Sequence, residues 1–147
     1  MQARISSIQV CPGHREPMRP LSTARLERGI GLDGDQHANA ASRRQVLIAD
    51  REALDQLDLE PGLIKENITA EGLDVMSLGP GTQLKLGAEA VVEITSICEP
   101  CFRMDEIRPG LKAELEGRRG MNSRVISGGQ IAVGDPITIV QQQELAS

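Results

Sequence analysis

Aromatic side chains are almost absent from this sequence of 147 residues, which has no tryptophan, no tyrosine and a single phenylalanine, Phe102. The core must therefore be built from Val, Ile, Leu and Ala, and the chain offers no aromatic platform on which nucleic-acid bases stack. The formal net charge of -5 also argues against nucleic-acid binding, because that function requires a basic surface. We therefore expect no nucleic-acid partner.

Long hydrophobic runs are missing as well, since no apolar stretch approaches the roughly 20 residues that span a bilayer. Residues 1–17 contain no apolar segment followed by small residues, as a secretory signal would. The three cysteines are an odd number, which suits reduced thiols better than a secreted disulfide framework. These features predict a soluble, cytoplasmic protein without membrane association, and none of them specifies an oligomeric state.

Short apolar runs of the β type recur along the chain, separated by Gly, Pro, Asn and Asp. They predict strands at residues 4–10, 44–49, 64–69, 82–86, 91–97, 123–126 and 136–140. Two helices are predicted: Asp50 caps the first, which runs to Leu57, and the second covers residues 111–116 before Gly117. Because helices do not alternate regularly with strands, a parallel βαβ architecture is disfavoured. We expect one mainly β domain over residues 1–147, a barrel or sandwich with a few short helices.

A loop that carries a thiol is the most informative feature of the chain. The apolar run at residues 91–97 is followed by Cys98-Glu99-Pro100-Cys101, so a strand delivers Cys101 to a loop. The arginines downstream of it are Arg103, Arg108, Arg118, Arg119 and Arg124. Positive charge near a thiol favours the thiolate, which attacks sulfur centres and binds soft metals. The alternative interpretation is a buried cysteine that acts as a small hydrophobic side chain.

Polar residues at the ends of loops and strands are further candidates. His37 ends a Gly- and Asp-rich segment and can act as a donor or proton carrier, although such aspartates are also ordinary turn formers. A calcium loop that starts at Asp33 is excluded, because its twelfth position is Arg44 rather than Glu. Arg44 and Gln45 head an apolar strand, where they offer donors to a phosphate or form a solvated strand end.

Two more pairs could serve the same ligand. Asn67 and Thr69 share one face of a predicted strand and can bind a heterocycle or phosphate, or hold a turn. Arg118 and Arg119 lie between glycines, in a loop that can wrap an anion. This loop is too short for a Walker motif and lacks its Lys-Ser/Thr pair, so nucleotide hydrolysis is not indicated.

The cysteines allow two alternatives to a single functional thiol. Cys98 and Cys101 have the spacing of a redox dithiol, but the βαβ context of a thioredoxin-type motif is missing. Cys11 and His14 together with Cys98 and Cys101 have spacings that zinc sites permit. The chain would then be a non-catalytic, zinc-stapled β-barrel that acts as a binding module.

Taken together and in this order, several short motifs resemble the MOSC domain, named for the C-terminal domain of molybdenum-cofactor sulfurases. The matching stretches are Gly34-Asp35-Gln36-His37, Arg44-Gln45-Val46-Leu47, Glu66-Asn67-Ile68-Thr69 with Gly72-Leu73, Leu78-Gly79-Pro80-Gly81, Leu86-Gly87, Pro100-Cys101, Gly117-Arg118-Arg119-Gly120 through Arg124-Val125, Gly128-Gly129 and Gly134-Asp135. The resemblance covers about residues 25–140. No single stretch is specific, but their order is.

The resemblance implies a MOSC-type β-barrel with a cleft that binds molybdenum cofactor, the molybdopterin complex of the metal. It makes Cys101 the functional thiol, as molybdenum ligand or as persulfide carrier. The candidate contacts for the pterin and its phosphate are His37, Arg44, Gln45, Asn67, Thr69, Arg118 and Arg119. The chain departs from larger relatives, because it has neither the pyridoxal-phosphate portion of the sulfurases nor the additional β domain of amidoxime-reducing enzymes. Pyridoxal phosphate is therefore not expected.

Two functions follow from the resemblance. In the first, Cys101 binds molybdenum and the protein reduces N-hydroxylated compounds with electrons from a separate electron-donor protein. In the second, Cys101 carries a persulfide, received from a sulfur-donor desulfurase, for the sulfuration of a cofactor or metallocluster, and Cys98 can resolve it as a disulfide. The sequence leaves open whether the chain is a molybdenum-dependent oxidoreductase or a sulfur transferase.

Overall fold

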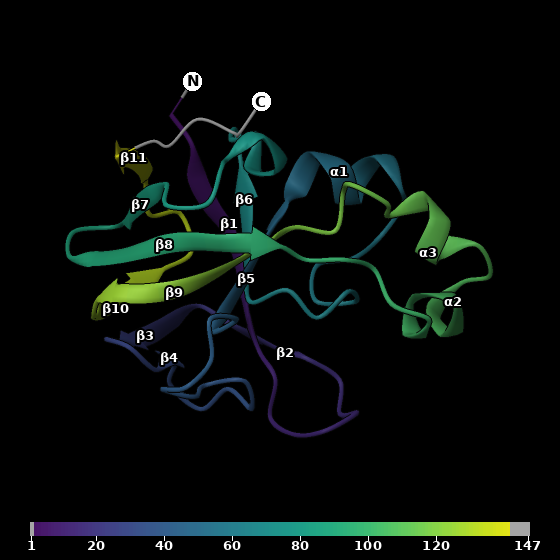
Figure 1. Cartoon of the computed structure of the whole chain (residues 1–147), viewed down its shortest axis with the longest axis horizontal. Coiled ribbons are helices and arrows are strands. Elements are labelled where there is room, and N and C mark those ends of the chain that lie inside the picture. Colours follow the sequence, from purple (N-terminus) through teal and green to yellow (C-terminus); the bar gives the residue numbers. More distant parts are fainter. Residues whose placement is uncertain (1, 142–147) are drawn as a thin grey trace.

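The computed structural model of the chain describes residues 2–141 (Figure 1). Its strands are β1 Arg4–Val10, β2 Arg19–Leu21, β3 Thr23–Glu27, β4 Gly31–Leu32, β5 Val46–Asp50, β6 Ile68–Glu71, β7 Gln83–Leu86, β8 Ala90–Ile97, β9 Met121–Ser127, β10 Gly129–Ala132 and β11 Ile137–Gln141. Its helices are α1 Arg51–Gln56, α2 Arg103–Ile107 and α3 Leu111–Glu114, with a 3₁₀ turn η1 at Val75–Ser77. The predicted mainly β class with short helices is therefore confirmed.

The strands form two sheets. The larger has eight strands in the order β11-β7-β8-β9-β5-β6-β1-β2, and the smaller has the order β10-β3-β4. Every strand pair is antiparallel except β5 and β6, which run parallel because α1 lies between them in the chain. The predicted absence of a regular βαβ architecture thus holds apart from this one crossover.

The closed barrel that the family resemblance implies is not confirmed. β11 and β2 are the two edges of the large sheet and are not paired with each other in the described part of the chain. The sheet curls far enough for an isolated bridge between Arg4 of β1 and Pro136, just before β11, and for backbone hydrogen bonds from Ile5 N to Asp135 O and from Ile137 N to Ala3 O, both 2.9 Å.

Two aliphatic clusters stabilise the molecule, as expected for a chain with almost no aromatic residues. The large cluster lies on the sheets and includes Ile5, Ile8, Ile48, Leu84 and Ile94, each no more than 1 % exposed. The small cluster lies where the helices gather at one end of the sheets (Figure 1). It comprises Ala49, Leu54, Leu59, Ile64, Met104, Leu111 and Leu115. Leu57 and Cys101 pack against it, so this cluster supports the loop that carries the thiol.

The ends of the helices agree with the sequence only in part. Asp50 precedes α1 at the N-cap position, as predicted, but its side chain makes no capping hydrogen bond. Instead, its carboxylate accepts a hydrogen bond of 2.9 Å from the backbone N–H of Val75 and so ties η1 to β5. Among residues 2–141, no helix is both long and apolar enough to cross a membrane.

Candidate functional site

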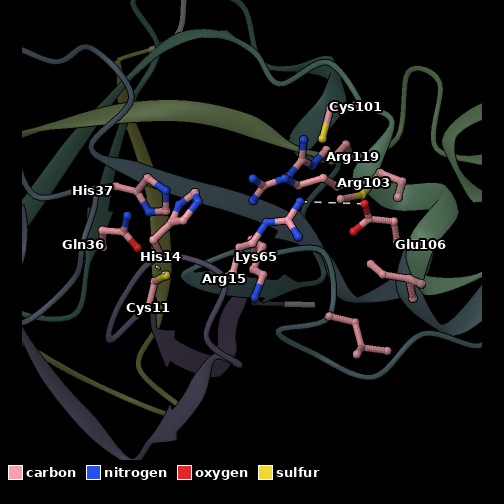
Figure 2. A pocket seen from close by; sticks show the side chains of 13 residues that line it. Cys11, His14, Arg15, Gln36, His37, Lys65, Cys101, Arg103, Glu106 and Arg119 are labelled. Atoms are coloured by element: carbon pink, nitrogen blue, oxygen red, sulfur yellow. Dashed lines mark hydrogen bonds and ion pairs between the residues drawn. The ribbon is translucent and has the colours of Figure 1, made fainter.

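A cavity of about 580 Å³ opens where loops from distant parts of the chain meet (Figure 2). Its lining comes from the 11–18 loop after β1, the 33–45 loop after β4, the segment before β6, the loop after β8, helix α2 and the segment before β9. The lining residues are Cys11, His14, Arg15, Gln36, His37, Leu63, Lys65, Cys101, Arg103, Met104, Glu106, Ile107 and Arg119. We refer to it as the basic cavity.

Positive charge dominates the basic cavity, although the chain as a whole has a net charge of -5. Arg15, Lys65, Arg103 and Arg119 line it, and each comes from a different segment. Glu106 is the one carboxylate in the lining, and its Oε1 lies 3.9 Å from a guanidinium nitrogen of Arg15. Guanidinium and ammonium groups on several sides of one cavity favour an anionic ligand, above all a phosphate.

Cys101 faces this cavity from the loop between β8 and α2. Figure 2 shows its thiol on the same side of the cavity as Arg119 and Arg103. The residue is half-buried, and its carbonyl oxygen accepts a hydrogen bond of 3.0 Å from Met104 N at the start of α2. The thiol is therefore both anchored and accessible, which is the combination that metal binding and sulfur transfer require.

Arg119 holds the thiol loop in place. Its two terminal nitrogens donate hydrogen bonds to the carbonyl oxygens of Glu99 (3.0 Å) and Ile64 (3.2 Å). Its Nε atom is buried and has no hydrogen-bond partner among the described residues. Arg119 thus joins the thiol loop to the segment before β6 and retains one unpaired donor beside the cavity.

Cys98 differs from Cys101 in its environment. It is half-buried and does not belong to the cavity lining. Burial raises the pKa of the Cys98 thiol, and the charges of Arg119 and Arg44 oppose this shift. Cys11, Cys98 and Cys101 are all free thiols.

Asp35 and His37 form a hydrogen-bonded pair in the 33–45 loop. The Asp35 side chain is 0 % exposed, and its Oδ2 lies 3.3 Å from His37 Nδ1 and accepts a 3.0 Å bond from His37 N. Its Oδ1 accepts bonds from Cys11 N (2.7 Å) and Asn67 Nδ2 (3.0 Å). Burial alone would raise the pKa of Asp35, but the hydrogen bonds from His37 and from Cys11 N outweigh burial and lower that pKa. The bond to Asp35 in turn raises the pKa of His37, which burial opposes.

The structure gathers three of the sequence-predicted site residues, Cys101, His37 and Arg119, in one cavity. Gln45 and Asn67 are 2 % exposed and lie outside its lining. Gln45 Nε2 donates to the carbonyl oxygens of Gly29, Asn39 and Ser42, and its Oε1 accepts from Val125 N. Asn67 Oδ1 accepts a 3.0 Å bond from Leu47 N. These amides hold the loops around the cavity.

Three other predicted residues also lie outside the cavity lining. Thr69 is 0 % exposed, and its hydroxyl donates a 3.1 Å bond to the buried carboxylate of Glu66. Arg44 and Arg118 are exposed. The backbone N–H of Arg44 donates to the hydroxyl of Ser42, which closes a turn.

The four residues of the zinc hypothesis, Cys11, His14, Cys98 and Cys101, do not form a metal site in the described part of the chain. Within residues 2–141, no group of three or more His, Cys, Asp or Glu side chains is arranged to hold a metal ion. Cys11, His14 and Cys101 all line the basic cavity, but Cys98 does not. Figure 2 shows Cys11 and Cys101 on different sides of the cavity.

Sequence reasoning missed several residues of the cavity. Arg15, Lys65 and Glu106 belong to no motif, and their proximity arises only from the folding of distant segments. Asp35, outside the lining, was interpreted as a turn former, although it stands two residues before His37 in the stretch Gly34-Asp35-Gln36-His37. The structure shows that its carboxylate is buried and accepts several hydrogen bonds.

Comparison with known proteins gives one family and one fold. The family model described as MOSC domain matches residues 35–138. The structure is similar to the YuaD protein from Bacillus subtilis, with a TM-score of 0.80 at 18% identity, over 93% of this chain and 94% of that chain. It is also similar to YiiM from Geobacillus stearothermophilus (TM-score 0.76, 19% identity, 95% of this chain, 75% of that chain). YiiM from Escherichia coli has a TM-score of 0.72 at 18% identity, over 95% of this chain and 71% of that chain. No curated protein gave a significant sequence match.

Proposed function

The chain belongs to the MOSC domain family, and from this premise we propose that it binds molybdenum cofactor in the basic cavity, with the Cys101 thiolate as molybdenum ligand. The observation that carries the proposal is the position of Cys101 in the same cavity as four cationic side chains. A thiolate is a soft ligand, and the pterin of the cofactor carries a phosphate that guanidinium groups recognise. The donors of the cavity therefore fit both parts of the cofactor.

Each part of the cavity has a role in this proposal. Cys101 holds the metal, and Arg103 and Arg119 beside it balance the negative charge of thiolate and ligand. The guanidinium of Arg119 also fixes the loop that carries Cys101, through its bonds to the carbonyl oxygens of Glu99 and Ile64. Arg15 and Lys65 bind the phosphate, while Gln45, Asn67 and Thr69 act indirectly by holding the surrounding loops.

The reaction that we propose is the reduction of an N-hydroxylated compound to its amine, fed by a separate electron-donor protein in the cytoplasm. When bound, the molybdenum centre supplies the redox-active site for this chemistry. The polypeptide binds and orients the cofactor, admits the substrate through the open cavity, and provides protons.

A sulfur carrier is the second candidate, and it is favoured by the half-buried, cavity-facing position of Cys101. A persulfide on Cys101 would be anionic and would be stabilised by the neighbouring guanidinium groups. Cys98, a free thiol three residues before Cys101, would resolve such a persulfide by forming a disulfide with the Cys101 sulfur and releasing hydrosulfide. The sulfur would come from a desulfurase.

The test is elemental analysis with pterin detection on protein produced in cells that synthesise molybdenum cofactor. Wild type, Cys101→Ala and the matched control Cys98→Ala are compared. Because the chain contains no Trp and no Tyr, the near-ultraviolet absorption of a bound pterin stands almost free of protein background. We expect near-stoichiometric molybdenum and pterin in wild type and Cys98→Ala, and loss of both in Cys101→Ala.

Two other results are informative. Wild-type protein without molybdenum, but with Cys101 heavier by the mass of one sulfur atom, would replace the metal-binding proposal with the sulfur carrier. Equal molybdenum in all three proteins would show that Cys101 is not the ligand.

A further inference from the structure

Asp35 is a buried carboxylate that acts on the basic cavity through His37. It accepts hydrogen bonds from two different loops, at Cys11 N and at His37 N, and a third from Asn67 before β6. A fully buried carboxylate with so many donors has a fixed position. Its contact with His37 Nδ1 at 3.3 Å therefore fixes the orientation of the imidazole as well.

The imidazole of His37 projects into the cavity. Its side chain is 52 % exposed and belongs to the lining, and Figure 2 shows the ring directed toward the interior from the 33–45 loop. Since Nδ1 is engaged by Asp35, Nε2 is the nitrogen presented to a ligand. An imidazole oriented by a buried carboxylate, with its second nitrogen facing a cavity, is the arrangement that proton transfer requires.

The charges around His37 act in opposite directions. Asp35 raises the pKa of His37 through the hydrogen bond and its charge, whereas burial and the charges of Lys65 and Arg119 lower it, and the net shift is upward. The ionisable groups that line the cavity with His37 are Cys11, His14, Arg15, Lys65, Cys101, Arg103, Glu106 and Arg119. The upward shift thus favours the imidazolium form of His37 despite these cations.

We infer that His37, oriented by Asp35, is a proton donor for the reaction in the cavity, an inference that rests on the proposed reduction of N-hydroxylated compounds. The overall reaction is R–NHOH + 2 H⁺ + 2 e⁻ → R–NH₂ + H₂O. The two electrons come from the separate electron-donor protein, and the N–O bond breaks. The leaving oxygen takes one proton from His37 Nε2 and departs as water, the nitrogen takes the second proton from solvent, and solvent reprotonates the imidazole.

The other cations of the cavity are poorer proton donors. Arginine does not release its proton in proteins, which excludes Arg15, Arg103 and Arg119. The ammonium group of Lys65 donates a 2.8 Å hydrogen bond to the carbonyl oxygen of Glu16. His37 combines an imidazole that can release its proton with a buried carboxylate that orients it.

The first experiment needs no cofactor. The chain contains two histidines, so the imidazole signals in an NMR titration are assigned with His14→Gln and His37→Gln. We expect Asp35→Asn to lower the pKa of His37, whereas Asp33→Asn, a change at an exposed carboxylate in the same loop, leaves it unchanged. Equal pKa values of His37 in wild type and Asp35→Asn would overturn the role of Asp35.

The second experiment uses protein isolated with the cofactor, N-phenylhydroxylamine as substrate and reduced methyl viologen as electron source. We expect His37→Gln to retain molybdenum but to lose about 10²-fold in kcat, together with the alkaline limb of the pH profile. In wild type that limb should follow the pKa of His37 measured by NMR, and in Asp35→Asn it should move to lower pH.

The outcomes separate the two proposals. If wild type reduces the substrate and His37→Gln does so with the same rate and pH profile, the proton-donor role is overturned and the proposed function stands. If wild type holds no molybdenum or reduces nothing, the proposed function fails and this inference fails with it.

Discussion

The guanidinium of Arg119 donates a 3.0 Å hydrogen bond to the carbonyl oxygen of Glu99, in the loop that carries Cys101. A second bond from Arg119 to Ile64 O extends this connection to the segment before β6. The hydrogen bonds of Arg119 thus fix both its own guanidinium and the loop that carries the Cys101 thiol. A change at Arg119 alters the loop as well as the charge.

Arg119→Gln should lower the free energy of unfolding by about 1–3 kcal/mol, because it removes two hydrogen bonds from a charged donor, one to the carbonyl of the buried residue Ile64 and one to that of the exposed Glu99. Urea denaturation of the protein without cofactor measures this change. Arg118→Gln is the matched control, since Arg118 is exposed and its substitution should change stability by less than about 0.5 kcal/mol. Equal losses for the two variants would contradict a tether at Arg119.

Gln45 supports the cavity from within the protein. Gln45→Ala should cost about 3 kcal/mol of stability, because four backbone groups that bond its amide lose their partner. The loss should be present in cofactor-free protein, as measured by thermal or urea unfolding. The neighbouring Arg44→Ala serves as control and should be nearly neutral. A Gln45→Ala protein of normal stability that fails only to bind cofactor would instead make Gln45 a direct contact.

The sequence predicted β1 and β8 well because their periodicity and flanking residues agree, whereas β9, Met121–Ser127, was predicted only at residues 123–126 and β3, Thr23–Glu27, was not predicted. β1 has the predicted bounds, Arg4–Val10, and β8 differs from the prediction by one residue at its start. β2, Arg19–Leu21, was not predicted, because it has only three residues, includes a proline and buries none of its side chains fully. Such a strand is formed by pairing with β1, which is a tertiary effect.

The candidate site could be predicted only where a local motif marked it. Cys101 and His37 stand in recognisable stretches, and both line the cavity. Asn67 and Thr69 stand in an equally recognisable stretch, yet their side chains are buried and bonded to other protein groups. Motif membership does not reveal which way a side chain points. Lys65, which has no motif, reaches the cavity because the segment before β6 folds across it.

Asp50 makes stability depend on pH in an unusual direction for a carboxylate. Burial, together with the charges of Asp74 and Glu52, raises its pKa from 3.8 to about 6 in the folded protein. The folded state therefore binds its proton more tightly than the unfolded state, so the contribution of Asp50 falls as the pH rises from about 4 to about 6. Asp50→Asn removes this dependence.

The prediction concerns the difference in unfolding free energy between Asp50→Asn and wild type. The free energy of unfolding of Asp50→Asn minus that of wild type should increase by about 2 kcal/mol between pH 4 and pH 7. The value of this difference at pH 4 does not affect the prediction. Urea denaturation at several pH values measures it, with the exposed Asp33→Asn as control. A difference that is constant with pH would show that the Asp50 carboxyl titrates normally.

Cys98 should be a slow nucleophile at neutral pH. Burial raises the pKa of its thiol, so the reactive thiolate is a minor form at pH 7. In a Cys101→Ser background, which removes the accessible thiol of the cavity, alkylation of Cys98 by iodoacetamide should accelerate steadily through pH 9, as followed by intact mass. Arg44→Gln should slow this reaction further, because the charge of Arg44 lowers the pKa of Cys98.

A rate that reaches its plateau below pH 8, or that Arg44→Gln increases, would contradict this assignment. It would then favour Cys98 as a resolving thiol already active at neutral pH, because a thiolate formed there can attack a persulfide on Cys101 without further deprotonation.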